Sequence, residues 1–295
     1  SISGTSMSGP HIAGMGALLA GQYPNWSPAQ IKSALMTSAR QNLSKEDGIT
    51  AADPFDFGAG HAAPVLAMEP GLTYDANVND YLAFMCGQDG ELFVAAQSDE
   101  TCDTLIAAGF STDASQLNYP SIAIEKLQNI KTISRTLTDV SGVGGTYTVS
   151  LDIPTGITMD VTTFDGEGNA TLSDDLVVTA NGKASFTITF GKTEAVVENE
   201  WLFGAITFTG SDGTAVRSPI AVKTQPSINI SVPESLSLEL RRGRAAFPVQ
   251  MLYSGKTSMD FAGLVSPFGS IRNVSQDPDQ SFTFNEAGLG THIFY

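Results

Sequence analysis

The chain has 295 residues, of which 42% are hydrophobic, and its 31 acidic and 15 basic side chains give a formal net charge of −16. This length predicts about two domains with real hydrophobic cores, and the apolar content excludes a disordered chain. The acidity excludes a general nucleic-acid binder because acidic proteins repel phosphate, and no apolar run approaches the roughly 18 residues that span a bilayer.

The first forty residues predict two helices. Apolar or small side chains at positions 12, 15, 16 and 19 recur at helical spacing, and the first helix should end before Pro24. Ser27 then predicts an N-cap, with Pro28 at the first position of a second helix. Its buried face should run to Ser38, and Arg40 suits its C-terminus.

The next eighty residues are acidic and rich in loops. Residues 41–75 contain many glycines and prolines, and a short apolar helix is expected over Val78–Met85, with Asn77 or Asn79 near its start. Residues 88–117 are weakly helical in character. Fourteen Asp and Glu and no Lys or Arg lie between Glu46 and Glu125, which indicates a solvated surface, with a calcium site or a salt-adapted surface as alternatives.

The composition changes near Leu117, where Thr, Val and Ile become frequent and apolar side chains alternate, as in strands. Asn181-Gly182 and Asp212-Gly213 are expected hairpin turns because both residue types tolerate positive φ. Strands at this spacing without helices predict an antiparallel sandwich. The predicted strands are Tyr147–Ile153, Ile157–Thr162, Leu176–Thr179, Ser185–Phe190, Trp201–Thr209 and Val216–Lys223.

Gln225-Pro226 looks like a further boundary, after which a second β-rich stretch follows. It stops inside a strand-like segment, so we expect the C-terminus to be cut. The strands predicted here are Ile228–Val232, Leu236–Leu240, Ala246–Tyr253, Met259–Val265, Phe282–Asn285 and Thr291–Tyr295.

The N-terminal segment Gly4-Thr5-Ser6-Met7-Ser8-Gly9-Pro10-His11-Ile12-Ala13-Gly14 carries the sharpest chemical signal. It is a turn of small residues that delivers Ser6 to the start of a helix. Free N–H groups and the positive end of the helix dipole stabilise an oxyanion there, so this serine suits acyl transfer. From the residues alone, an ordinary serine-capped helix is the alternative.

This segment resembles the nucleophile motif of the subtilisin-like serine proteases, or subtilases. The run Phe57-Gly58-Ala59-Gly60-His61 with Pro70-Gly71-Leu72 resembles the close of the catalytic domain in plant, cucumisin-like members, and Asp80-Tyr81-Leu82 continues it. Leu117-Asn118-Tyr119-Pro120-Ser121-Ile122 resembles the start of their fibronectin type III-like domain. The resemblance covers about residues 1–224.

The resemblance implies a secreted serine endopeptidase that cleaves protein or peptide substrates through an acyl-enzyme, without a cofactor. Ser6 would be the nucleophile and its own N–H an oxyanion donor, whereas His11 matches a position that is not the base. Subtilase triads run in the order Asp, His, Ser, and only five residues precede Ser6. We therefore expect the C-terminal part of a protease, inactive alone. His61, in its Gly-Ala-Gly-His loop, is expected to be a structural histidine bonded to backbone.

Cys86 and Cys102 are the two cysteines of the chain. By themselves they leave open a disulfide or two buried thiols. The secretion that the resemblance implies favours a disulfide between them.

Four pieces are expected: the end of an α/β catalytic domain over residues 1–75, a connecting segment over 76–116, a fibronectin-like β-sandwich over 117–224, and a partial β module over 225–295. The alternative is a non-catalytic β-sandwich segment for binding or adhesion.

Residues 165–169 are expected to be a turn, with a calcium loop as the alternative. Residues 241–244, Arg-Arg-Gly-Arg, are expected to be a solvated turn. The Asn-x-Ser/Thr sequences that begin at Asn42, Asn169, Asn229 and Asn273 matter only in a eukaryotic secretory route.

Overall fold

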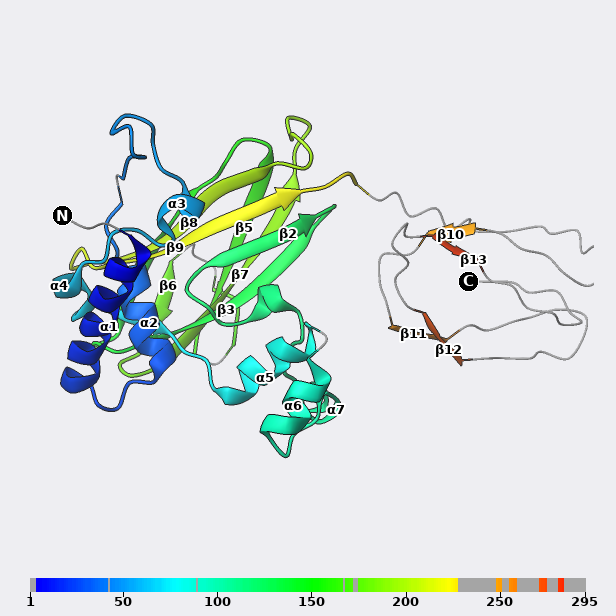
Figure 1. The fold of residues 1–295 in the computed structure, drawn as a ribbon, viewed down its shortest axis with the longest axis horizontal. Helices are drawn as coiled ribbons and strands as arrows, with labels where there is room; N and C mark the ends of the chain where they lie inside the picture. Colours follow the sequence, from blue (N-terminus) through cyan, green and yellow to red (C-terminus); the bar gives the residue numbers. More distant parts are fainter. Residues whose placement is uncertain are drawn as a thin grey trace, which may run out of the picture. The chain divides into compact units, whose positions relative to one another are not determined.

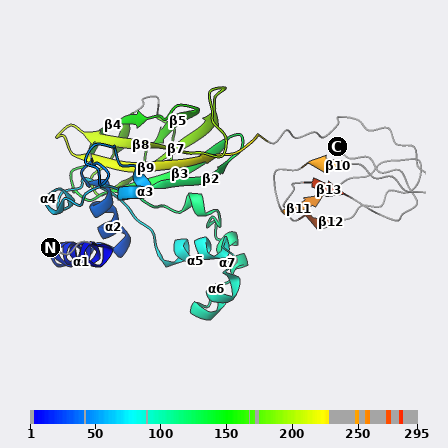
Figure 2. The same ribbon diagram turned by 45° about the horizontal axis from the view of Figure 1, so that its top comes forward.

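The computed structural model describes residues 4–41, 43–88, 90–166, 168–171 and 175–227, together with the backbone of four short strands after residue 247. The chain forms two compact units, residues 1–226 and 227–295, which are considered separately. In the first unit, helices at the N-terminal end of the chain lie against a β-sandwich, and a second helical group follows them (Figures 1 and 2). The expected order, the end of an α/β domain followed by a β-sandwich, is confirmed as a helical N-terminal stretch followed by the sheets of a sandwich.

The N-terminal helices form as the sequence predicts. Helix α1 spans Thr5–Gln22 and helix α2 spans Pro28–Thr37. Ser27 caps α2 in a capping box: its hydroxyl accepts the N–H of Gln30, whose side chain accepts the N–H of Ser27. α2 contacts the sandwich strands β1 (Leu72–Tyr74) and β9 (Ala215–Thr224), and α1 packs on α2. Arg40 is not a C-terminal residue of α2 but lies beyond it, where its backbone pairs with His61.

Two short helices, α3 (Pro54–Phe57) and α4 (Pro64–Ala67), interrupt the loops before the sandwich. Phe55 of α3 fixes this loop on the sheet, with its ring edge-on to Trp201 and Phe203 at centroid distances of 4.9 and 5.0 Å. Such edge-to-face contacts stabilise beyond the area they bury.

The connecting segment is helical. It contains α5 (Val78–Cys86), capped by Asn77 as expected, then α6 (Glu91–Gln97), α7 (Cys102–Ala107) and a 3-10 turn at Ala114–Gln116. Its core is small and is stapled by a disulfide between Cys86 and Cys102, whose Cα atoms lie 5.7 Å apart. The predicted pairing of the two cysteines is therefore present.

The sandwich has two sheets. One contains β1 (Leu72–Tyr74), β3 (Lys131–Asp139), β7 (Lys183–Lys192) and β5 (Ile157–Phe164), in that order. The other contains β2 (Ile122–Leu127), β9, β8 (Trp201–Gly210), β4 (Gly145–Asp152) and β6 (Leu176–Val178). Strands β4 to β9 fall within two or three residues of their predicted positions. β1, β2 and β3 were not predicted.

Two expectations about the sandwich are wrong. β2 pairs with β9 in parallel, from Ile122 opposite Ile220, so the sandwich is not purely antiparallel. The pairing is allowed because almost the whole sandwich separates these two strands along the chain. Asn181-Gly182 is not a hairpin turn, because β6 and β7, which flank it, belong to different sheets. Asp212-Gly213 does join the paired strands β8 and β9, with Gly213 at φ 86°.

Apolar side chains from both sheets fill the space between them. Phe186 and Phe208 meet across it with ring centroids 4.8 Å apart, and Tyr74 of β1 lies in the same core at 1% exposure. The Tyr74 hydroxyl hydrogen-bonds the Ser218 hydroxyl at 2.8 Å, and burial raises the pKa of Tyr74 to about 12. Residues 72–74, which the sequence places at the end of the α/β segment, thus complete a sheet of the sandwich.

Side-chain amides cover the open edge of β3. Gln116 donates to the Thr132 carbonyl and accepts the Ser134 N–H, while Asn118 donates to the Thr136 carbonyl and accepts the Thr136 N–H. Each amide therefore takes the place of a peptide group from a neighbouring strand, which removes free edge groups that could pair with another chain.

The second unit is described only by the backbone of four strands. β10 (Pro248–Gln250) pairs with β13 (Ser281–Thr283), and β11 (Gly255–Ser258) pairs with β12 (Ile271–Val274). β10 and β13 overlap predicted strands, whereas β11 and β12 were not predicted. The strands predicted at 228–232, 236–240, 259–265 and 291–295 and the basic cluster at 241–244 lie outside the described residues.

Candidate active site

Ser6 lies in the first turn of α1, as the sequence predicts. Gly4 precedes the helix at φ 155°, and its carbonyl accepts the N–H groups of Met7 and Ser8 at 3.0 and 3.1 Å. Ser6 is exposed, and neither its hydroxyl nor its N–H has a partner among the described residues. A free N–H at a helix N-terminus beside a free hydroxyl can serve a nucleophile and its oxyanion together.

Pro10 loosens the helix directly below Ser6. In a regular helix the N–H of residue 10 would bond to the carbonyl of residue 6, but proline has no N–H to give. The Ser6 carbonyl therefore lacks its helical partner, so the first turn is tied to the rest of α1 by fewer bonds.

The described histidines are not positioned as a base for Ser6. The His11 ring lies over its own helix and donates from Nδ1 to the Met7 carbonyl at 2.6 Å. His61 pairs through its backbone with Arg40, with N···O distances of 2.8 and 2.9 Å in the two directions. Its imidazole is exposed and makes no hydrogen bond within the described part of the chain. The bonds of His61 to the backbone of Arg40 are therefore made by its own main chain and not by its ring.

Gly60 explains the glycine pattern before His61. It has φ 130°, and a Cβ at this position would lie 2.5 Å from the Arg40 carbonyl oxygen. Only glycine therefore permits the two segments to pair. The bridge ties the loop that follows α2 to the loop that follows α3.

One side of α1 has little cover in this chain. Ile12 is 43% and Leu18 66% exposed, while Leu19 is buried against α2. An apolar cavity of about 480 Å³ opens between α1, α2 and α4, lined chiefly by Met15, Leu18, Leu35, Val65 and Met68. Exposed apolar surface of this kind forgoes roughly 25 cal/mol of stabilisation for each Å² left in water.

Hydrogen bonds connect the helices that carry Ser6 to the sandwich. The Ser33 hydroxyl of α2 accepts the N–H of Tyr74 at 2.9 Å, and the Ser27 hydroxyl donates to Asp75 at 2.5 Å. Asn118 also donates to the Asp75 carbonyl at 2.8 Å. α2 and its N-cap are therefore bonded to the C-terminal end of β1.

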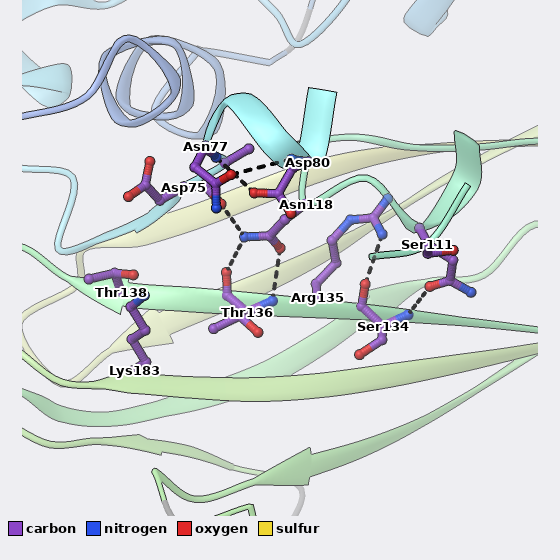
Figure 3. Close-up of a pocket in the computed structure, with 12 residues that line it drawn as sticks. Asp75, Asn77, Asp80, Ser111, Asn118, Ser134, Arg135, Thr136, Thr138 and Lys183 are labelled. Carbon is purple, nitrogen blue, oxygen red and sulfur yellow. Dashed lines mark hydrogen bonds between the residues drawn. The ribbon is translucent and has the colours of Figure 1, made fainter. Parts of the chain in front are cut away.

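A polar crevice of about 810 Å³ lies between α5 and β3 (Figure 3). Its side chains mostly bond to one another or to backbone. Arg135 is 3% exposed and donates to the carbonyls of Tyr119, Ser121 and Ser134, and burial lowers its pKa to about 10. These bonds indicate that Arg135 has a structural role.

Neither a metal site nor a membrane helix is found in the described ranges. No group of three or more His, Cys, Asp or Glu side chains there could hold an ion. The backbone N–H of Asp165 donates to the carbonyl of Asn169 and the N–H of Asn169 to the Asp165 carboxylate, so these residues form the expected turn. None of the helices in the same ranges is long and apolar enough to cross a bilayer.

Two known protein families match parts of this chain. The model of the subtilase family matches residues 1–60, and that of the fibronectin type-III domain matches residues 116–222. The chain belongs to the subtilase family. Within the family it matches a C-terminal portion: the end of the protease segment followed by a fibronectin-like domain.

The subtilases similar to this chain include plant proteins. Subtilisin-like protease Glyma18g48580 of Glycine max is 40% identical over 233 residues, which cover 75% of this chain and 27% of that protein. Subtilisin-like protease SBT2.5 of Arabidopsis thaliana is 34% identical and SBT1.7 of the same plant is 37% identical, over 74% and 75% of this chain and 27% and 29% of those proteins. The chain thus spans little more than a quarter of these relatives.

Sequence reasoning missed two features of this subtilase segment. The loss of the helical bond at Ser6 could have been read from Pro10, since proline four residues after a position always removes that bond. The backbone pairing of Arg40 with His61 carries no local signal in the sequence, because it depends on two loops meeting in space.

Proposed function

We propose that this chain supplies the nucleophile of a serine endopeptidase, with Ser6 attacking the peptide carbonyl to form an acyl-enzyme. The observation that carries the proposal is the exposed Ser6 in the first turn of α1, with its hydroxyl and its N–H both free of partners in the described residues. The subtilase match over residues 1–60 supports the same role.

In this proposal the Ser6 N–H donates to the oxyanion as the tetrahedral intermediate forms. The positive end of α1 adds a favourable field at the same place, and glycine at position 4 keeps a side chain away from it. The base histidine, its aspartate and a second oxyanion donor come from polypeptide outside this sequence, consistent with a match that covers 75% of this chain but only 27% of the relative. Without them Ser6 has no proton acceptor, so residues 1–295 alone should not turn over peptides.

We propose that the protein is secreted and acts on protein substrates outside the cell. The Cys86–Cys102 disulfide supports this, because such bonds persist in oxidising compartments and are rare in the cytosol. It staples a helical segment whose own core is small.

The test uses the full-length protein with Ser6→Ala, compared with Ser8→Ala. Ser8 is a matched control because it is exposed in the same turn and its hydroxyl makes a single long bond, 3.4 Å, to the Gly4 carbonyl. Ser6→Ala should lower casein turnover by several orders of magnitude, whereas Ser8→Ala should change it little. If Ser6→Ala keeps as much casein turnover as Ser8→Ala and the wild type, Ser6 is not the nucleophile, and a non-catalytic binding segment is favoured.

A further inference from the structure

The sandwich has one side where both sheets end in strands with a free edge. β5 is the last strand of one sheet and β6 the last strand of the other, within the described residues. Some of their Cα atoms lie within 8 Å of each other, so the two edges share one side of the molecule. Asp160 is the one charged residue of either strand. A β-rich edge with so little charge can pair with another chain.

The loop after β5 folds back onto the end of that strand and presents Asn169. The N–H of Thr171 donates to the Thr163 carbonyl at 2.8 Å, and the N–H of Asp165 donates to the Asn169 carbonyl at 3.0 Å. These bonds cover the last residues of β5 but leave Thr158–Thr162 open. Asn169 is exposed where the turn closes on Asp165, and it begins the sequence Asn-Ala-Thr.

We propose that Asn169 carries an N-linked glycan and that this glycan shields the shared edge of β5 and β6. The modification rests on the secretory route of the proposed function. Its co-reactant is a lipid-linked oligosaccharide pyrophosphate. The Asn169 amide nitrogen forms a bond to the anomeric carbon and loses one proton, and the bond from that carbon to the pyrophosphate oxygen breaks, releasing the lipid pyrophosphate.

The local geometry accommodates the modified side chain. Asn169 Nδ2 donates to the Asp165 carboxylate at 3.2 Å, and the modified nitrogen keeps one of its two N–H groups for this bond. Among the described residues Asn25 also begins such a sequence, Asn25-Trp26-Ser27, but its serine caps α2, bonds through its hydroxyl to Asp75 and is followed by Pro28. Asn42, Asn229 and the side chain of Asn273 lie outside the described residues.

The position of the glycan complements the protection of the opposite edge. On β3 the amides of Gln116 and Asn118 occupy the free backbone groups. No side chain in the described ranges does the same for Thr158–Thr162 of β5. A glycan is bulky and strongly hydrated, so one at Asn169 would hold other chains away from this edge.

The modification is tested on the full chain, carried into the secretory pathway of a eukaryotic host by an added signal peptide. A reporter Asn-Gly-Thr in a flexible C-terminal tail identifies the chains that met the glycosylation machinery, and those chains alone are scored. Mass spectrometry should find a glycan on the peptide containing Asn169, and Asn169→Gln should lose one glycan step on a gel. Asn79→Gln, a half-buried control outside any such sequence, should lose none. An unmodified Asn169 in chains whose reporter is occupied overturns the proposal.

The shielding role is tested by self-association. Asn169→Gln should self-associate several-fold faster than the glycosylated chain in light scattering. Adding Thr162→Lys, an exposed position on β5, should suppress this association if the edge is the route. An Asn169→Gln protein that associates no faster than the glycosylated chain, or a double variant that associates equally fast, would show that the glycan does not protect this edge.

Discussion

Asp139 is the side chain on which the turns at one end of the sandwich depend. It is 3% exposed at the end of β3. One carboxylate oxygen accepts the N–H and hydroxyl of Ser141, and the other accepts the N–H groups of Gly142, Gly144 and Asn181 at 2.8–3.2 Å. One carboxylate thus organises both the loop between β3 and β4 and the turn between β6 and β7.

Asp139→Ala removes all of these acceptors at once. Four backbone N–H groups lose their partner, and each net hydrogen bond is worth about 1 kcal/mol. The expected loss is therefore about 3–4 kcal/mol of unfolding free energy. Since a folded domain has about 5–15 kcal/mol in total, this variant should be folded but much closer to its unfolding threshold.

The assay is urea unfolding of the full chain, followed by Trp201 fluorescence in a Trp26→Phe background so that one tryptophan reports on the sandwich. Asp212→Ala is the matched control, because Asp212 also holds a turn but is exposed and bonds only to Thr214. The control should lose about 1 kcal/mol or less. If Asp139→Ala falls within about 1 kcal/mol of the control at an unchanged m-value, the carboxylate does not organise these turns.

Three further predictions concern the same unit. Burial alone raises the pKa of Asp139, but its hydrogen bonds outweigh burial and hold the pKa below the ordinary value. The stability that Asp139 adds is thus complete above the ordinary Asp pKa of about 4 and shrinks as the pH falls below it, so urea midpoints of wild type and Asp139→Asn should converge in acid; a constant difference contradicts this. Tyr74→Phe, which leaves the Ser218 hydroxyl unpaired, should cost about 1–2 kcal/mol in urea unfolding, and no loss would mean that water replaces the bond. Replacing Cys86 and Cys102 by Ser should cost about 3 kcal/mol and open the helical segment first in hydrogen exchange; unchanged protection there refutes its dependence on the disulfide.

The strands that sequence reasoning missed show why alternation fails at particular residues. In β3 the inward positions are Ile133, Arg135, Leu137 and Asp139, all buried. Two charged residues at inward positions hide the apolar pattern on which a strand prediction depends. Both are tolerated because local groups satisfy them, Arg135 by carbonyls and Asp139 by N–H groups. β1 has three residues, too few for a period to emerge.

A local sequence pattern also could not predict which strands pair with each other. The alternation in β9 predicts a strand but not that β2, from the other end of the sandwich, pairs with it in parallel. By contrast, Ser27-Pro28 was predicted correctly as a helix start, and Asn77, one of the two candidates named with Asn79, is the cap of α5, because a cap is decided by its immediate neighbours.

The candidate site shows the same difference between local signals, which the sequence carries, and long-range contacts, which it does not. Ser6 was chosen as the candidate nucleophile because the segment that carries it is a continuous run of residues, and its place in the first turn of α1 agrees with the prediction. Its catalytic partners cannot be derived from these residues, since triads are assembled from segments far apart in sequence.

The central claim is that Ser6 is the nucleophile of a serine protease. The most direct measurement is covalent labelling of the active full-length protein with a serine-directed phosphonate, followed by mass spectrometry to locate the adduct. The account predicts one adduct, on Ser6, absent in Ser6→Ala and retained in Ser8→Ala. An active protein whose adduct lies on another residue, or which stays labelled after Ser6→Ala, would contradict it.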